Sequence, residues 1–126
     1  MSQQVSDSEL EILKIIWANG GSALYAHIKE ELSKTGRTWQ KNTVITLLSR
    51  LVDKGIVKTS KIGRRNEYTA IVSEEGYQTA QTQTLLNKLY EGSAKDLVST
   101  LIRQDMISAE DYEELKKFWE SGAKES

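Results

Sequence analysis

The side chains best suited to chemistry lie in residues 39–55, where the polar positions are of types that read nucleic acids. Apolar residues recur there at helical spacing, so they share one face of a helix at about 100° per residue. They are Val44, Leu47, Leu48, Leu51 and Val52. The opposite side carries small polar, β-branched and basic residues, namely Asn42, Thr43, Ile45, Thr46, Ser49 and Arg50. Such side chains approach base edges closely and touch thymine methyl groups.

Two interpretations fit this pattern: a DNA-recognition helix, and an ordinary amphipathic helix with a small-residue polar face. Gly55 is expected to end the helix as its C′ residue. Trp39 stands just before the helix, where its ring could pack beneath the helix or its indole N–H could reach a phosphate. The surrounding sequence favours the recognition helix.

Charge is divided unevenly along the chain. The net charge of −1 looks unsuited to a nucleic-acid partner. However, residues 37–65 hold eight basic residues and one acidic residue, a local net charge of +7, whereas residues 73–126 carry −5. Because attraction to phosphate is screened beyond about 10 Å in ordinary salt, the local charge decides. The basic segment coincides with the candidate recognition helix.

Composition excludes several classes of protein. The 126 residues suit one domain, or a small domain with an appendage. No apolar run reaches the roughly 20 residues of a membrane span, and no signal peptide is evident, so we expect a cytoplasmic protein. There is no cysteine, hence no thiolate metal site, and the single histidine, His27, is interpreted as a surface residue. No catalytic constellation or phosphate loop is present, so neither enzymatic activity nor a cofactor is predicted.

The elements before and after residues 39–55 predict a winged helix-turn-helix. A capping box of the form S-x-x-E opens a first helix at Ser6, and Ser22 is expected to cap a second. After Gly55, residues 56–62 and 67–72 are rich in β-branched and aromatic residues and predict a hairpin, with 63–66 as its turn. A basic hairpin tip is often merely solvated, but directly after a recognition helix it predicts a DNA-contacting wing.

The last third of the chain predicts three amphipathic helices. They begin after residue 73, at Ser93 and at the second capping box, Ser108 to Asp111. We expect a DNA-binding domain over residues 1–72 and a dimerisation domain over 73–126, because three such short helices cannot bury all their apolar faces alone. The dimer contacts are predicted at Leu86, Leu89, Tyr90, Leu97, Val98, Leu101, Ile102, Leu115 and Trp119. The expected fold class is mainly α with a small β hairpin.

Several of these segments, in order, resemble the penicillinase and methicillin-resistance repressors (BlaI/MecI type), a family that also includes copper-responsive regulators (CopY type). The resemblance covers roughly residues 5–120. It is carried by Ser6-Asp7 with Glu9-Leu10, by Ile15-Ile16-Trp17, by the pattern from Trp39 to Lys54-Gly55, by Tyr68-Thr69, and by Leu89-Tyr90 with Gly92. It implies a homodimeric winged-helix repressor of a palindromic operator, with resistance or copper-transport genes as targets.

This chain departs from the family at three places. Gln40-Lys41 replaces the usual Ser-Pro, which predicts a weaker helix cap, and Ile45 replaces a basic or polar residue, which predicts a different operator. The resemblance implies a point of inactivating proteolysis at Thr100-Leu101, where the usual Asn-Phe pair is missing. Copper sensing through thiolates is excluded because there is no cysteine.

The sequence therefore predicts a sequence-specific repressor without a metal. Bases would be read by Asn42, Thr43, Ile45, Thr46 and Ser49, with Trp39 positioning the helix. Phosphates would be neutralised by Lys41, Arg50, Lys54, Lys58, Lys61, Arg64 and Arg65. The alternative is a winged-helix interaction module whose basic face binds an acidic protein partner.

Overall fold

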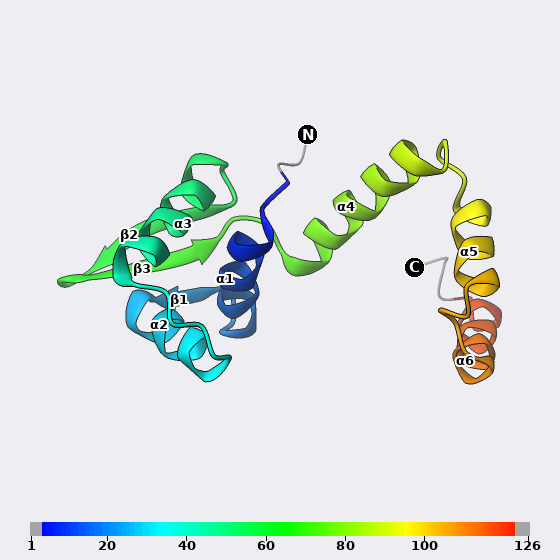
Figure 1. Ribbon diagram of the computed structural model, residues 1–126, viewed down its shortest axis with the longest axis horizontal. Coiled ribbons are helices and arrows are strands. Elements are labelled where there is room, and N and C mark those ends of the chain that lie inside the picture. The colour runs from blue at the N-terminus through cyan, green and yellow to red at the C-terminus, as the bar shows by residue number, and fades with distance from the viewer. Residues whose placement is uncertain (1–3, 123–126) are drawn as a thin grey trace. The chain divides into compact units, whose positions relative to one another are not determined.

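The computed structural model describes residues 4–122 and is mainly helical, as predicted. The elements are α1 (Asp7–Ala18), β1 (Ser22–Leu24), α2 (Tyr25–Lys34), α3 (Lys41–Asp53), β2 (Val57–Ile62), β3 (Arg65–Ala70), α4 (Glu74–Leu89), α5 (Ala94–Arg103) and α6 (Ala109–Glu120), labelled in Figure 1. The chain divides into two compact units, an N-terminal unit, Met1–Gln81, and a C-terminal unit, Thr82–Ser126. The division falls inside α4, so the N-terminal unit extends beyond residue 72.

The helix ends follow the local sequence at most of the predicted positions. Ser6 Oγ accepts a hydrogen bond from Glu9 N at 3.1 Å, and Ser6 N donates to Glu9 Oε1 at 2.9 Å, which completes the predicted capping box of α1. Ser108 and Asp111 form the same arrangement at α6. At the end of α3, Gly55 has φ +74° and its N–H bonds Val52 O, which is the predicted C′ position.

The prediction for Ser22 is wrong, because Ser22 does not cap α2. It begins β1, and its hydroxyl hydrogen-bonds the hydroxyl of Thr69 at 2.8 Å. The N-cap of α2 is Leu24, whose side chain makes no capping hydrogen bond. Strand β1 is only three residues long, too short for an alternating apolar pattern to be recognised in the sequence.

The sheet is antiparallel, in the order β1-β3-β2. The predicted hairpin is confirmed, but its turn is tighter than expected. Ile62 pairs with Arg65, so only Gly63 and Arg64 lie in the turn, and Gly63 has φ +64°. Arg65 and Asn66, which we expected in the turn, belong to β3. A two-residue turn of this kind favours a residue that tolerates positive φ, which Gly63 supplies.

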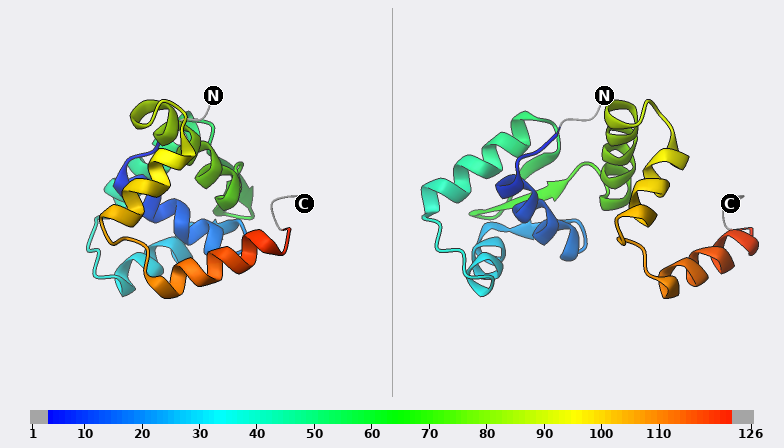
Figure 2. Two further views of the ribbon diagram at one scale, coloured as in Figure 1. Left: turned by 90° about the vertical axis from the view of Figure 1, so that its right-hand side faces the viewer. Right: turned by 45° about the vertical axis from the view of Figure 1, so that its right-hand side comes forward.

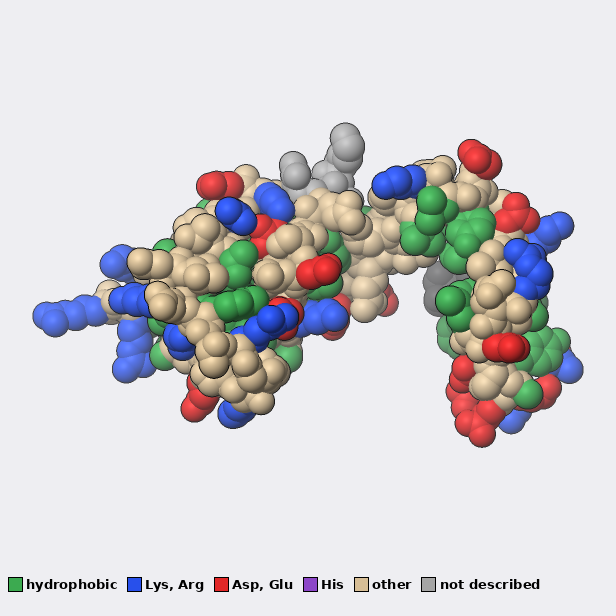
Figure 3. All heavy atoms as spheres, viewed as in Figure 1, with side chains coloured by type: hydrophobic (Ala, Val, Ile, Leu, Met, Phe, Trp, Pro, Cys, Tyr) green, Lys and Arg blue, Asp and Glu red, His purple; other side chains and the backbone are tan. Residues whose placement is uncertain are grey.

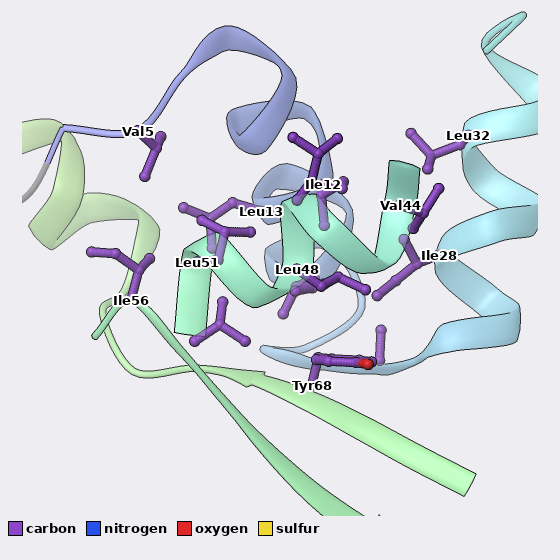
Figure 4. Packing of buried hydrophobic residues seen from close by; sticks show 14 of the residues in the cluster. Val5, Ile12, Leu13, Ile28, Leu32, Val44, Leu48, Leu51, Ile56 and Tyr68 are labelled. Carbon is purple, nitrogen blue, oxygen red and sulfur yellow. The ribbon is translucent and has the colours of Figure 1, made fainter. Parts of the chain in front are cut away.

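One hydrophobic core lies between α1, α2, α3 and the sheet (Figure 4). The predicted α3 stripe is confirmed, with Val44, Leu47, Leu48 and Leu51 buried and Val52 partly buried. Tyr68 of β3 lies beneath Leu48 in Figure 4 and is itself buried. With the inner face of α3 held in this way, its outer face is fixed on the surface of the N-terminal unit.

The C-terminal unit contrasts with this core. Neither α5 nor α6 contains a buried residue, and several large apolar side chains are more than half exposed, including Ile102, Phe118 and Trp119. Figure 2 shows α5 and α6 meeting at a corner rather than packing along each other. Within residues 4–122, no helix is long and apolar enough to cross a membrane.

Candidate nucleic-acid interface

The outer face of α3 presents the side chains predicted to read bases. Asn42, Thr43, Thr46 and Ser49 are exposed, and Ile45 is partly buried at the margin of the face. Because the helix is fixed from behind by Val44, Leu47, Leu48 and Leu51, these short side chains hold defined positions on the surface. The arrangement could enter a major groove, whose width admits one α-helix.

The N-terminus of α3 is open, as the replacement of Ser-Pro predicted. Gln40 is the N-cap residue, with φ −72° and ψ 161°, and its side chain makes no capping hydrogen bond. The first turn also contains no acidic residue. A helix start without a side-chain acceptor presents backbone N–H groups and the positive end of the helix dipole, which suits a phosphate.

Trp39 packs against the core, which is one of the two roles predicted for it. It is partly buried against the core, and its carbonyl oxygen accepts a hydrogen bond from Lys29 Nζ at 2.6 Å. The guanidinium carbon of Arg37 lies 4.9 Å from the centre of the Trp39 ring, and Arg37 also pairs with Glu11 at 2.8 Å. These supports from Lys29, Arg37 and Glu11 could not be predicted, because the three residues lie on other elements or in the preceding loop and form no periodic pattern.

Six of the seven side chains predicted to neutralise phosphates are exposed. Those that are exposed are Lys41, Arg50, Lys58, Lys61, Arg64 and Arg65. The last four lie on the β2–β3 hairpin, which projects from the body of the N-terminal unit (Figure 1). Figure 3 shows Lys and Arg side chains gathered toward the end of this hairpin. The structure therefore places four of the predicted phosphate-binding side chains on an exposed hairpin.

Lys54 differs from the other predicted phosphate ligands. Its Nζ lies 2.6 Å from Glu9 Oε1 and 3.3 Å from the carbonyl oxygen of Gln4, and Glu9 is only 2% exposed. Burial raises the pKa of the Glu9 carboxyl, but hydrogen bonds from Lys54 and the Ser6 backbone, with the charge of Lys54, hold that pKa below its ordinary value of 4.5. The ammonium of Lys54 is therefore committed within the protein.

His27 lies partly buried on α2 beside two acidic residues. Ligand atoms of His27, Glu30 and Glu31 lie within 4.8 Å of one another. Glu31 is already paired with Lys34 at 2.8 Å, and this hydrogen bond lowers the pKa of the Glu31 carboxyl. Such groups are common on helix surfaces, and nothing else in the described residues marks this one as a metal site.

The predicted dimer contacts lie on the surface of the C-terminal unit or at the end of α4. Leu86, Tyr90, Leu97 and Leu101 are partly buried, while Leu89, Val98, Ile102, Leu115 and Trp119 are exposed. An open groove of about 770 Å³ between α5 and α6 is lined mainly by apolar side chains. Its apolar lining includes Val98, Ile102, Ile107, Tyr112, Leu115, Phe118 and Trp119.

Thr100 and Leu101, the predicted point of proteolysis, lie within α5 and are partly buried. The Thr100 hydroxyl donates to the carbonyl oxygen of Asp96 at 3.3 Å, one turn earlier. A protease that binds extended backbone would have to unwind this turn before cutting it.

Comparison with known proteins agrees with the sequence resemblance. The family model described as "Penicillinase repressor" matches residues 5–121. The penicillinase repressor of Bacillus licheniformis is 37% identical over 117 residues, covering 93% of this chain and 90% of that protein. The methicillin resistance regulatory protein MecI of Mammaliicoccus sciuri is 28% identical over 113 residues, covering 90% of both chains.

Solved structures resemble a smaller part of the chain. The DNA-binding domain of the repressor BlaI, determined in solution, has 40% identity and a TM-score of 0.52, covering 61% of this chain and 94% of that one. Monomeric Bacillus licheniformis BlaI in complex with the blaP half-operator has 39% identity and a TM-score of 0.52, covering 61% and 92%.

Proposed function

This chain belongs to the penicillinase repressor family, and we propose that it is a homodimeric transcriptional repressor that binds a palindromic operator. The observation that carries the proposal is the outer face of α3, where short polar side chains are exposed beside a basic hairpin. The relative whose structure includes the blaP half-operator supports DNA as the ligand of this chain. The family supports antibiotic-resistance genes as targets and the cytoplasm as the location.

The side chains divide by role. Asn42, Thr43, Ile45, Thr46 and Ser49 read bases in the major groove. Lys41 and the open N-terminus of α3 bind one stretch of backbone phosphate. Lys58, Lys61, Arg64 and Arg65 place the hairpin on the neighbouring backbone, and Arg50 adds a further phosphate contact at the edge of α3. Repression follows because the bound protein occupies the promoter.

The dimer is proposed from the exposed apolar surface of the C-terminal unit. Side chains such as Leu115 and Phe118 are each more than half exposed, and an apolar groove lies between α5 and α6. A second copy related by a two-fold axis would cover both surfaces at once. Two linked DNA-binding units then read two half-sites, and the palindrome of the operator reflects the symmetry of the dimer.

Proteolysis at Thr100-Leu101 is the proposed route of inactivation. A cut there leaves two fragments of α5, and such short helices are unstable in water without packing. The dimer surface would be lost, and each DNA-binding unit would hold a half-site too weakly to repress. This step requires a protease partner, and its trigger in this chain need not be a β-lactam because the usual Asn-Phe pair is absent.

A selection experiment tests the proposal. The purified full chain is used to enrich duplexes from a randomised library, and the enriched duplex is compared with a shuffled duplex over a range of salt concentrations. Thr46→Ala should cost about 1–3 kcal/mol on the enriched duplex and relax its specificity. Arg64→Ala should weaken both duplexes similarly and reduce the salt slope by about 0.9.

Thr79→Ala is the matched control for Thr46→Ala, because Thr79 is an exposed threonine on α4, away from α3 and the hairpin. It should leave both affinities unchanged. Failure to enrich any duplex would sink the repressor proposal. The basic face would then favour the alternative, a module that binds an acidic protein.

A further inference from the structure

An ion pair joins the C-terminal end of α3 to the first turn of α1. Lys54 is the C-cap residue of α3, and its Nζ contacts Glu9 Oε1 at 2.6 Å and the Gln4 carbonyl oxygen at 3.3 Å. Glu9 is 2% exposed, whereas the Lys54 side chain keeps 29% of its surface accessible. We refer to Glu9 and Lys54 as the positioning pair.

The carboxylate of this pair is held rigidly by its own helix. Glu9 Oε1 accepts a hydrogen bond from Ser6 N at 2.9 Å, and Glu9 N donates to Ser6 Oγ at 3.1 Å. The preceding residue, Val5, is buried, and its N–H donates to the Tyr77 hydroxyl at 3.1 Å. A buried carboxylate needs a partner, because an unpaired charge in the interior is costly. Glu9 therefore fixes where Lys54 lies.

The other end of α3 is also connected to α1, but at the surface. Arg37 pairs with Glu11 at 2.8 Å and lies against the ring of Trp39, just before α3 begins. The side chains of Arg37 and Glu11 are 46% and 35% exposed, and exposed ion pairs contribute little. The Arg37–Glu11 pair therefore serves as a control for the positioning pair.

From this geometry we propose that Lys54 and Glu9 set the orientation of α3 for base readout, and that Lys54 does not contact a phosphate. The inference rests on the proposed function. Helix α3 has 13 residues and is about 20 Å long. A tilt of 10° about one end would move the other by about 3 Å, which exceeds the tolerance of a hydrogen bond to a base edge. Fixing the helix end therefore protects specificity.

The two roles of Lys54 predict different salt dependence. A lysine that neutralises a phosphate releases counterions, so its loss lowers the slope of log K against log salt by about 0.9. A lysine committed to Glu9 releases none, so its loss leaves the slope unchanged. The roles also predict opposite effects of changing Glu9, since removing the carboxylate would free Lys54 for a phosphate.

The test uses the full chain, the duplex that the wild type enriches, and a shuffled duplex. Lys54→Met, Glu9→Gln, the double variant and Lys54→Arg are compared at a temperature where each is folded by circular dichroism. Lys54→Met and Glu9→Gln should each lower the ratio of enriched to shuffled affinity by about tenfold, with an unchanged salt slope. The double variant should be no worse than Lys54→Met, because the two residues act as one unit. Lys54→Arg, which keeps the charge, should restore most of the ratio.

Arg37→Met is the matched control, because it breaks the exposed ion pair between Arg37 and Glu11 of α1. It should change the affinity ratio less than Lys54→Met or Glu9→Gln does.

Three results would overturn the inference. One is a slope that falls by about 0.9 in Lys54→Met while Glu9→Gln keeps or gains affinity, which would make Lys54 a phosphate ligand. Another is a lower melting temperature with an unchanged affinity ratio, which would leave the pair with a role in stability alone. If Lys54→Met does not fold, Glu9→Gln and Lys54→Arg decide the matter by the same readouts. The third is a wild-type chain that enriches no duplex, which would overturn the proposed function as well. If the wild type enriches a duplex and the variants keep its affinity ratio, only the role of the positioning pair is overturned.

Discussion

The two units of this protein place their apolar side chains differently. In the N-terminal unit, residues such as Ile12, Leu48 and Leu51 are almost completely buried in one core. In the C-terminal unit, α5 and α6 bury nothing fully, and Phe118 and Trp119 are each 64% exposed. Burying apolar surface is the main favourable contribution to folding. The first unit thus contains its own stabilising core, whereas the second leaves its apolar surface exposed to solvent.

Cutting the chain at the boundary between the units should give the largest effect. We expect residues 1–81 to fold as a monomer and to bind the palindromic duplex about 10²–10⁴-fold more weakly than the full chain. The reason is that a monomer has no second DNA-binding unit linked to the first. Light scattering and a mobility-shift titration would measure both. A dimer of residues 1–81 would contradict the comparison.

The two compact units divide after residue 81, nine residues beyond the boundary expected from the sequence. Tyr77 is buried, its ring centre lies 5.9 Å from that of Trp17, and its hydroxyl accepts from Val5 N. Ending the chain at residue 72 removes these contacts, so that shorter chain should melt at a lower temperature than residues 1–81.

Leucine-to-alanine substitutions in the two units should differ in their effect on the free energy of unfolding. Leu48 is 1% exposed, so Leu48→Ala should reduce the free energy of unfolding of residues 1–81 by about 2–5 kcal/mol. Leu89, 60% exposed at the end of α4, is the matched control in the full chain. Leu89→Ala should leave the unfolding transition of the N-terminal unit unchanged. Urea denaturation followed by tryptophan fluorescence measures both, and equal losses would remove the distinction between the units.

A charge placed on the exposed apolar surface should weaken the dimer directly. Leu115→Lys should lower the free energy of dimer dissociation by about 1.5–3 kcal/mol, the value of one buried leucine side chain, without changing the melting of the N-terminal unit. Glu113→Lys adds the same side chain to α6 at an exposed acidic position and is the control. Sedimentation equilibrium would report the two constants, and indistinguishable values would place the interface elsewhere.

Acid should affect the N-terminal unit through Glu9. The pKa of Glu9 in the folded protein lies below the ordinary value of 4.5, so its ionised form stabilises the fold above that pH, and this contribution is lost as pH falls through the folded pKa. Glu9→Gln should therefore be less stable than the wild type at neutral pH, and the gap should narrow in acid. Urea unfolding of residues 1–81 at both pH values measures it; a gap that widens in acid would show the opposite sign of linkage.

The sequence alone was enough to predict the elements whose residue patterns are local. The α3 stripe, the capping boxes and the hairpin each follow from spacing within a few residues, and all three are confirmed. The features that were missed depend on residues far apart in the chain. Lys54 and Glu9 are separated by 45 positions, and β1 finds its partner only in β3. Lysine and glutamate side chains are usually exposed, so nothing in the local sequence indicated that Glu9 would be buried and paired with Lys54.

The pairing of β1 with β3 also has a consequence for how the protein is made. Ser22 and Thr69 lie 47 positions apart, and Val5 and Tyr77 lie 72 apart, so the core closes only when distant segments meet. A nascent chain cannot form contacts to residues not yet synthesised. Most of the polypeptide must leave the ribosome before the first unit can become compact. Chains arrested before residue 69 should therefore be digested by a protease that spares chains extended well past residue 77, and early protection would show that α1 and α2 fold without the sheet.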